Sequence, residues 1–170
     1  MSAGRPVCVL VGAPGAGKST VGRALAKALD VEFRDTDEDI ERMAGKPIPE
    51  IFVDEGETHF RTLERAAVAA ALASCTGVLA LGGGAVLAEE NRAALVGHTV
   101  VHLSVELTDA IKRVDLGVGR PLLSINPRAT LRYLLDQRRP FYREVATATV
   151  VTDGRDPEAV VTEVLTLLGR

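Results

Sequence analysis

Residues 12–20 read GAPGAGKST, and this stretch decides the fold. The pattern is glycine, four residues, glycine, lysine and then serine or threonine. Its four fixed positions are Gly12, Gly17, Lys18 and Ser19. Glycines let the backbone turn so that its N–H groups point at an anion, and the helix that follows adds partial positive charge. The stretch therefore predicts a phosphate-binding loop, in which Lys18 reaches the outer phosphates and the Ser19 hydroxyl ligates Mg²⁺.

The flanking residues place this loop between a strand and a helix. Residues 7–11 read VCVLV, an apolar and β-branched run typical of a buried parallel strand. After the loop, Val21, Leu25 and Leu29 recur every four residues, which marks one face of a helix. A glycine-rich turn that binds nothing is the alternative interpretation. The strand before the loop and the helix after it favour the phosphate-binding interpretation.

The composition is that of one ordinary globular domain. The 170 residues are 46% hydrophobic and 25% charged, enough to bury a core. The net charge of −3 argues against a nucleic-acid partner, since such proteins are usually basic. No apolar run is long enough to cross a membrane, and the first strand begins too early for a signal peptide. With Cys8 and Cys75 as its only cysteines, the protein is expected to be cytoplasmic, with reduced thiols.

Strands and helices are expected to alternate along the chain. Strands are predicted at residues 7–11, 31–36, 78–81, 99–105 and 147–152. Helices are predicted at residues 21–29, 37–44, 48–54, 57–73, 89–96, 108–116 and 127–145, and after a cap formed by Asp156 and Pro157. This alternation predicts an α/β fold in three layers, a parallel sheet covered by helices on both faces. Ligands bind such sheets at the carboxyl ends of the strands, so the loops after the first three strands should share one crevice.

Further motifs follow the second and third strands and continue towards the C-terminus. DTD at 35–37 follows the second strand, and GGG at 82–84 follows the third. The remaining motifs are GETHFRTLE at 56–64, RPLL at 120–123 and RRPFY at 138–142. Together with the phosphate-binding loop, and in this order and spacing, the set closely resembles the shikimate kinase family over nearly the whole chain.

The resemblance implies a single shikimate kinase domain over residues 1–170, with a P-loop kinase fold and a five-stranded parallel sheet in the order 2-3-1-4-5. It implies a substrate-binding segment at about residues 35–64 and a lid at about residues 113–127. The implied reaction transfers the γ-phosphoryl group of ATP to the 3-hydroxyl of shikimate, the fifth step of chorismate and aromatic amino acid biosynthesis. The implied partners are shikimate and ATP, with Mg²⁺ as cofactor, and we expect a monomer.

The resemblance also assigns the residues of the site. Those expected to bind ATP are Gly15, Ala16, Gly17, Lys18, Ser19, Thr20, Arg120 and Arg155. Those expected to bind shikimate are Asp37, Arg61, Gly83 and Arg138, and those expected to hold the metal are Ser19 and Asp35. The expected catalytic residues are Lys18, Asp37 and Arg120, with Arg120 as the lid arginine that closes over ATP.

The chemistry of shikimate supports these assignments independently. Shikimate is a small carboxylate that carries hydroxyls, and the planar fork of arginine grips a carboxylate through two parallel hydrogen bonds. Arg61 could instead form a solvated ion pair with Glu57 or Glu64 on a helix surface. Asp37 could simply cap a helix, which is compatible with substrate binding, and residues 82–84 could form a plain turn.

Other functions remain open at this point. Gluconate kinase and adenylate kinase share the loop and the fold, and a non-catalytic nucleotide-binding module would also contain the loop. Adenylate kinases usually have GKGT where this chain has GKST at 17–20. None of these alternatives explains DTD, GGG and the arginines around a pocket for a small acid. Phe52 and Phe60 either line that pocket, as the resemblance implies, or pack in the core.

Overall fold

The computed structural model describes residues 4–106 and 127–170, and residues 1–3 and 107–126 lie outside that description. Five parallel strands form one sheet in the order β2-β3-β1-β4-β5, which confirms the predicted fold class and strand order. The strands are β1 (Cys8–Val11), β2 (Phe33–Asp35), β3 (Val78–Ala80), β4 (Val100–Ser104) and β5 (Ala148–Val151). Each predicted strand overlaps an observed one and extends slightly beyond it.

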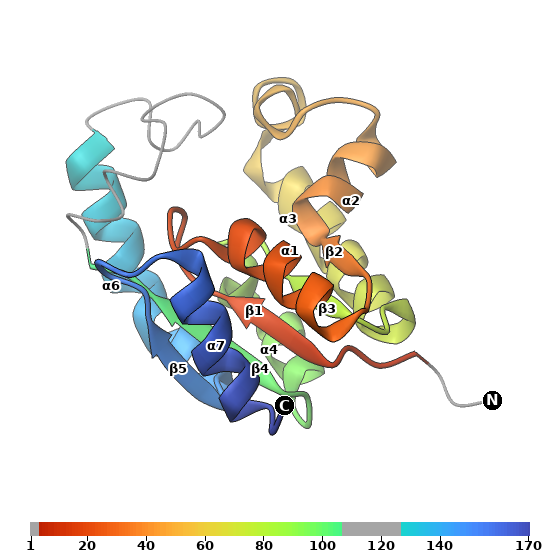
Figure 1. The fold of residues 1–170 in the computed structure, drawn as a ribbon. Coiled ribbons are helices and arrows are strands. Elements are labelled where there is room, and N and C mark those ends of the chain that lie inside the picture. Colours follow the sequence, from red (N-terminus) through yellow and green to blue (C-terminus); the bar gives the residue numbers. More distant parts are fainter. Residues whose placement is uncertain (1–3, 107–126) are drawn as a thin grey trace.

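Helices cover both faces of this sheet. They are α1 (Lys18–Leu29), α2 (Thr36–Ala44), α3 (Ile48–Ser74), α4 (Glu89–Leu95), α6 (Pro127–Val145) and α7 (Pro157–Leu167), with a short 3₁₀ helix, η1 (Ala85–Leu87). Figure 1 shows α1 and α7 side by side on one face, α4 and α6 on the other, and α2 with the start of α3 in a lobe beyond β2. The predicted helix at 108–116 and most of the predicted lid lie outside the described residues.

The helix α3 is interrupted at Gly56. The sequence predicts two helices, at 48–54 and 57–73, and the structure runs them as one element around a break at this glycine. Gly56 has φ of 86° and ψ of 169°, a backbone region that is essentially restricted to glycine. The segment after the break carries Arg61, so the change of direction at Gly56 positions this side chain relative to the sheet.

The main core lies between the sheet and its helices. All four residues of β1 are buried, which explains why the sequence of a strand covered on both faces is a continuous apolar run. Cys8 and Cys75 are buried free thiols, and burial raises the pKa of Cys8 to about 12. They therefore pack as small apolar side chains, and their free state agrees with the reduced thiols expected from the sequence.

A second, smaller core holds the α2–α3 lobe together. It consists of Ile40, Ile51, Phe60 and Ala67. Phe52 packs against this cluster, and its ring centroid lies 4.7 Å from that of Phe60. Phe60 is only 4% exposed, so the structure supports core packing for this residue. The lobe that carries the predicted substrate-binding segment thus has apolar support of its own.

The final helix begins at the predicted place and at the predicted cap residue. Asp156 occupies the N-cap position and Pro157 the first turn, but the Asp156 side chain makes no capping hydrogen bond. The helix buries one apolar face, because Val160, Val161 and Val164 pack against the core. None of the helices in the described part of the chain combines the length and the apolarity needed to cross a membrane.

Candidate active site

The loops that follow β1, β2 and β3 meet at one edge of the sheet. Neighbouring parallel strands end on the same side, and β3 lies between β1 and β2. The Gly82 N–H donates to Thr36 Oγ1 at 3.2 Å, which joins the loops after β2 and β3. The Leu81 N–H donates to the Leu10 carbonyl at 3.0 Å, which joins β3 to β1. The shared edge expected from the sequence is therefore formed through direct contacts.

The phosphate-binding loop has the backbone geometry that its glycines suggest. Gly15 and Gly17 have φ of 85° and 90°, in the left-handed region that favours glycine. Helix α1 begins at Lys18, so its first N–H groups face the loop. The Lys18 ammonium donates to the carbonyls of Gly12 at 2.7 Å and Ala13 at 3.1 Å. A cation and a helix N-terminus therefore converge on the loop, the arrangement that binds phosphate groups.

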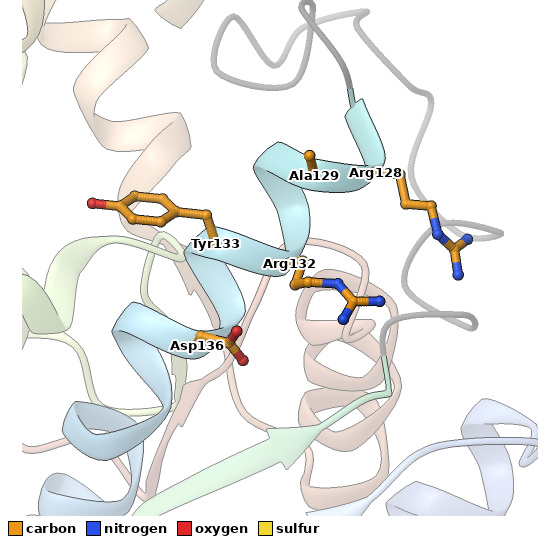
Figure 2. Close-up of a pocket in the computed structure, with 5 residues that line it drawn as sticks. All are labelled: Arg128, Ala129, Arg132, Tyr133 and Asp136. Atoms are coloured by element: carbon orange, nitrogen blue, oxygen red, sulfur yellow. The ribbon is translucent and has the colours of Figure 1, made fainter.

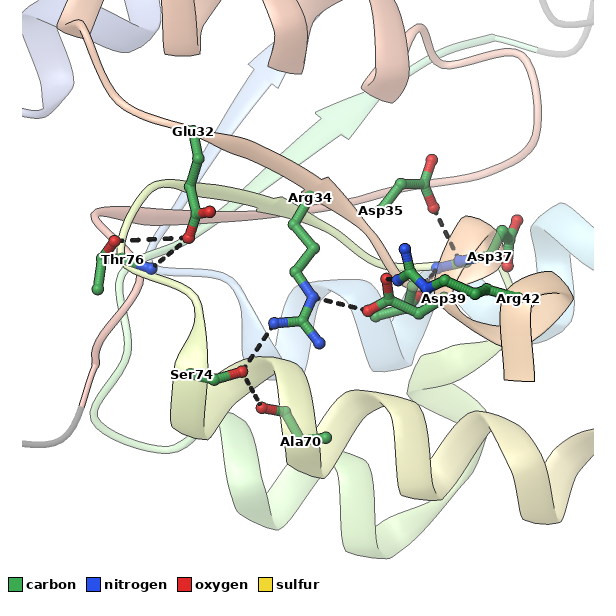
Figure 3. Close-up of polar contacts among 11 residues, drawn as sticks. Glu32, Arg34, Asp35, Asp37, Asp39, Arg42, Ala70, Ser74 and Thr76 are labelled. Atoms are coloured by element: carbon green, nitrogen blue, oxygen red, sulfur yellow. Dashed lines mark hydrogen bonds and ion pairs between the residues drawn. The ribbon is translucent and has the colours of Figure 1, made fainter.

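The two predicted metal ligands lie next to each other. The Ser19 hydroxyl donates to Asp35 Oδ2 at 3.1 Å. The other carboxylate oxygen of Asp35 accepts the Asp37 N–H at 2.8 Å and so caps α2, as Figure 3 shows. The alternative in which Asp37 caps the helix is therefore wrong. A hydroxyl and a carboxylate form a donor set suited to Mg²⁺, which takes few protein ligands and retains several waters.

Ion pairs fasten the start of α2 to its neighbours. Asp39 is 5% exposed and pairs with Arg34 through Nε at 2.7 Å and with Arg42. Arg34 Nη1 also donates to Ser74 Oγ at 2.7 Å, at the end of α3 (Figure 3). Hydrogen bonds between charged groups are the stronger kind. This cluster therefore fixes the direction in which α2 presents Asp37.

Each glycine of the 82–84 turn lies against a different predicted substrate-binding side chain. A β-carbon would stand 2.5 Å from Asp37 Oδ1 if built on Gly82, 3.3 Å from Arg138 Nη1 if built on Gly83, and 2.6 Å from Arg61 Nη1 if built on Gly84. Two arginines and a carboxylate thus converge on one turn. The glycines are needed because any side chain would compete with these groups for space, so the structure argues against a plain connecting turn.

A buried carboxylate holds Arg61 in place. Arg61 Nη1 donates to Glu64 Oε1 at 2.8 Å, and its Nη2 lies 3.5 Å from Glu57 Oε1. Glu64 is 2% exposed, whereas Glu57 is exposed. Burial raises the pKa of Glu64, and the positive charge of Arg61 opposes that shift. The alternative of a solvated surface ion pair therefore applies only to the contact of Arg61 with Glu57. The buried Glu64 orients the Arg61 guanidinium.

Arg138 is a buried cation. Its side chain is 4% exposed, and its Nε has no hydrogen-bond partner among the described residues. Burial lowers the pKa of Arg138, although an arginine keeps its charge in proteins. A buried cation with an unsatisfied donor is costly, and an anionic ligand would remove that cost. Arg138 therefore fits the carboxylate-binding role that the sequence assigns to it.

One predicted ATP contact, Arg155, lies apart from this cluster. Arg120 is outside the described residues. Arg155 is anchored between β5 and α7, where Nη1 donates to Glu163 Oε1 at 2.7 Å and to the Val151 carbonyl at 2.9 Å. Its contact with adenine stays a prediction. Ala16 and Thr20 lie in the phosphate-binding loop and in the first turn of α1.

Sequence reasoning gave no role to three residues that shape the site. Tyr142 Oη donates to the Gly83 carbonyl at 2.5 Å, and the Tyr142 ring stacks on His102 with centroids 4.9 Å apart. Thr36 Oγ1 accepts the Gly82 N–H. The signals for two of them were present, because Tyr142 ends RRPFY and Thr36 is the centre of DTD. A single histidine within an apolar strand gave no such signal for His102.

A separate pocket of about 400 Å³ lies along the first turns of α6 (Figure 2). Its described lining consists of Arg128, Ala129, Arg132, Tyr133 and Asp136. Figure 2 shows the two arginines on one side of the helix and the tyrosine on the other. These residues form an exposed surface of a single helix, and none of them is predicted to bind ATP, shikimate or metal. We therefore assign the candidate active site to the edge of the sheet.

Comparison with known proteins agrees with this assignment. The shikimate kinase family model matches residues 14–169. The shikimate kinase of Salinispora tropica is 77% identical over 163 residues, which covers 96% of this chain and 98% of that protein.

Solved structures have the same fold. A shikimate kinase from Acinetobacter baumannii, in complex with shikimate, superposes with a TM-score of 0.92 at 41% identity, covering 97% of this chain and 93% of that one. A gluconokinase from Sinorhizobium meliloti has a TM-score of 0.59 at 24% identity, covering 98% and 92%, and shares the fold alone. Since the family model spans most of its length and its relatives match nearly end to end, this chain belongs to the shikimate kinase family.

Proposed function

We propose that this chain transfers the γ-phosphoryl group of ATP to the 3-hydroxyl of shikimate, giving shikimate 3-phosphate and ADP. This is the fifth step of chorismate biosynthesis. The observation that carries the proposal is the convergence of Asp37, Arg61 and Arg138 on the 82–84 turn, beside the phosphate-binding loop. Two guanidinium forks suit a carboxylate, and a carboxylate side chain suits hydroxyls. The relative from Acinetobacter baumannii, whose structure contains shikimate, supports the same substrate.

The phosphates of ATP bind along residues 15–20. Backbone N–H groups of the loop and of the first turn of α1 face the phosphate oxygens. Lys18, whose ammonium already lies against the Gly12 and Ala13 carbonyls, is within the loop that these phosphates enter. Arg120, in the lid, closes over ATP, and Arg155 contacts the adenine.

Ser19 and Asp35 hold the Mg²⁺ that accompanies ATP. The Ser19 hydroxyl would ligate the ion, and the Asp35 carboxylate would hold one of its waters. When bound, the ion neutralises charge on the β- and γ-phosphate oxygens. The 3.1 Å contact between the two side chains supports their acting together. Within the described residues no three His, Cys, Asp or Glu side chains gather as a metal site, and this fits an ion shared between protein and phosphates.

Shikimate binds at the 82–84 turn, beside the phosphate-binding loop. Arg61 and Arg138 pair with its carboxylate, and the Gly83 N–H donates to it. Asp37 accepts hydrogen bonds from the ring hydroxyls and so aims the 3-hydroxyl at the γ-phosphorus. Phosphoryl transfer passes through a loose transition state, so this orientation contributes more than early removal of the proton. The proposed enzyme acts as a monomer with a lid and a substrate-binding segment.

A coupled ADP-release assay tests the function. The protein is supplied with magnesium and ATP, and with shikimate, gluconate, AMP or no acceptor. We expect rapid ADP release with shikimate alone, and a phosphate ester at the 3-position in the ³¹P spectrum of the product. Release with gluconate or AMP instead would favour the corresponding small-molecule kinase. ATP binding without turnover on any acceptor would favour a non-catalytic nucleotide-binding module.

A further inference from the structure

The hydroxyl of Tyr142 holds the peptide group between Gly83 and Gly84. Tyr142 lies on α6, is 2% exposed, and donates through Oη to the Gly83 carbonyl at 2.5 Å. Its ring stacks on His102 of β4, with the ring planes inclined by 26°. One side chain therefore links α6, β4 and the glycine turn, at the place where the proposed substrate carboxylate binds.

The glycine turn has its acceptors occupied and two donors available. The carbonyls of Gly82 and Gly84 each accept an N–H group of η1 at 3.1 Å, and the carbonyl of Gly83 accepts the Tyr142 hydroxyl. The N–H groups of Gly83 and Gly84 donate to none of the described residues. A turn that offers backbone N–H groups while its carbonyls are occupied suits an anion.

The direction of the Gly83 carbonyl controls the direction of the next N–H donor, which belongs to Gly84. The peptide bonds of the described chain are trans, and in a trans peptide the C=O and the N–H point in opposite directions. Because the Gly83 carbonyl points at Tyr142, the Gly84 N–H points away from it. Glycines on both sides leave this peptide free to rotate at low cost. A rotated peptide would direct a carbonyl oxygen, and hence negative charge, towards the bound acid.

The charges around Tyr142 agree with this arrangement. Burial raises the pKa of Tyr142 to about 12, so the hydroxyl keeps the proton that it donates at neutral pH. The guanidinium of Arg138 lies close enough to Tyr142 that each affects the pKa of the other. Tyr142 thus borders both of the groups, Arg138 and the 82–84 turn, that would receive a carboxylate.

We propose that Tyr142 is a positioning residue for the carboxylate of the acceptor substrate: its hydroxyl fixes the Gly83–Gly84 peptide so that the turn presents the Gly84 N–H, beside Arg61, as a donor. Tyr142 touches neither substrate in this arrangement and acts through the turn. Tyr142 therefore affects the binding of the acid and leaves the binding of the nucleotide unchanged. The inference rests on the proposed shikimate kinase activity and adds to it a determinant of how tightly the acid binds.

The variant Tyr142→Phe tests this inference, because it keeps the ring and the stack on His102 and removes only the hydroxyl. The matched control is Tyr133→Phe, on the same helix, where the tyrosine is 62% exposed. Leaving a buried carbonyl unsatisfied should raise the shikimate KM by about 5- to 30-fold, with the ATP KM within about twofold of wild type. Tyr133→Phe should change neither constant. Equal rises in both constants for Tyr142→Phe, or no rise, would overturn the inference.

A spectroscopic measurement decides the matter even if Tyr142→Phe does not fold. The chain has two tyrosines, so in Tyr133→Phe the only tyrosine is Tyr142. Labelled with 3-fluorotyrosine, this protein gives one ¹⁹F resonance, which should shift with shikimate and shift less with its carboxamide analogue. If saturating shikimate left this resonance unchanged while the protein still phosphorylated shikimate normally, the inference would be rejected and the proposed function would stand. Wild-type protein that does not phosphorylate shikimate would reject the function itself.

Discussion

The guanidinium of Arg61 lies directly against Gly84. A β-carbon built on Gly84 would stand 2.6 Å from Nη1 and 2.7 Å from Nη2 of Arg61. The backbone of Gly84, at φ −99° and ψ 3°, is open to other residues. Glycine is therefore required at this position by the space that Arg61 occupies, and the backbone conformation does not require it.

The variant Gly84→Ala should separate substrate binding from folding. The added methyl group displaces the end of the flexible Arg61 side chain, so we expect the shikimate KM to rise about tenfold or more, about 1.4 kcal/mol in binding. The ATP KM and the melting temperature should change little. The control is Gly77→Ala, whose β-carbon would stand 2.0 Å from the backbone oxygen of Glu32. It should lower the melting temperature without a selective rise in the shikimate KM. An unchanged shikimate KM in Gly84→Ala would contradict the placement of Arg61.

The two glutamates beside Arg61 should differ in importance. Glu64→Gln removes a buried charge that holds the guanidinium at 2.8 Å, and we expect the shikimate KM to rise by about tenfold or more. Glu57→Gln removes an exposed partner at 3.5 Å and should change it by about twofold or less. Steady-state kinetics with each substrate varied in turn measures both effects. Similar KM values in the two variants would show that Glu64 does not orient Arg61.

The stability of the protein should fall in mild acid because of His102. Burial, together with the nearby charges of Arg143, Lys18 and Arg139, lowers the pKa of His102 from 6.5 to about 4. The unfolded chain therefore binds a proton near pH 6.5 that the native state accepts only near pH 4. The free energy of unfolding should be highest above pH 6.5 and decrease as the pH falls to about 4, by about 3 kcal/mol at most from this group.

Urea unfolding between pH 7 and pH 4.5 measures this decrease. His102→Gln should give a flatter dependence of unfolding free energy on pH, whatever its stability at pH 7. Identical slopes in wild type and His102→Gln would mean that another group is responsible.

Lys18→Ala should abolish turnover without unfolding the protein. The ammonium lies in the phosphate-binding loop, so its loss should lower kcat by about 10²- to 10³-fold or more. Shikimate binding, measured by calorimetry without nucleotide, should stay close to that of wild type. A circular dichroism spectrum like that of wild type establishes the fold. Substantial phosphate transfer by this variant would contradict the role of the loop.

The layered sheet and the phosphate-binding loop could be predicted because their signals are local. The run VCVLV at 7–11 marks a strand buried on both faces, and the loop motif follows it directly. Gly56 was recognisable as a break for the same reason, since its conformation depends on a single residue. The order of the strands came from the resemblance to a family, because no local pattern records which strands pair.

The finer parts of the site depend on contacts that a linear pattern does not contain. Asp35 and Asp37 are both carboxylates at the start of one helix, and only the backbone geometry decides that Asp35 is the cap. The hydrogen bond from Tyr142 to Gly83 spans 59 positions of the chain, so periodicity could not predict it. The ion pair of Arg155 with Glu163 likewise depends on how β5 meets α7, which no linear pattern records.

A crystal structure of the protein with shikimate and a non-hydrolysable ATP analogue tests the central claim most directly. We expect the carboxylate of shikimate between Arg61 and Arg138 beside Gly83, and its 3-hydroxyl at Asp37, facing the terminal phosphate on residues 15–20. Shikimate bound at another place, or bound with its carboxylate turned away from both arginines, would contradict the account.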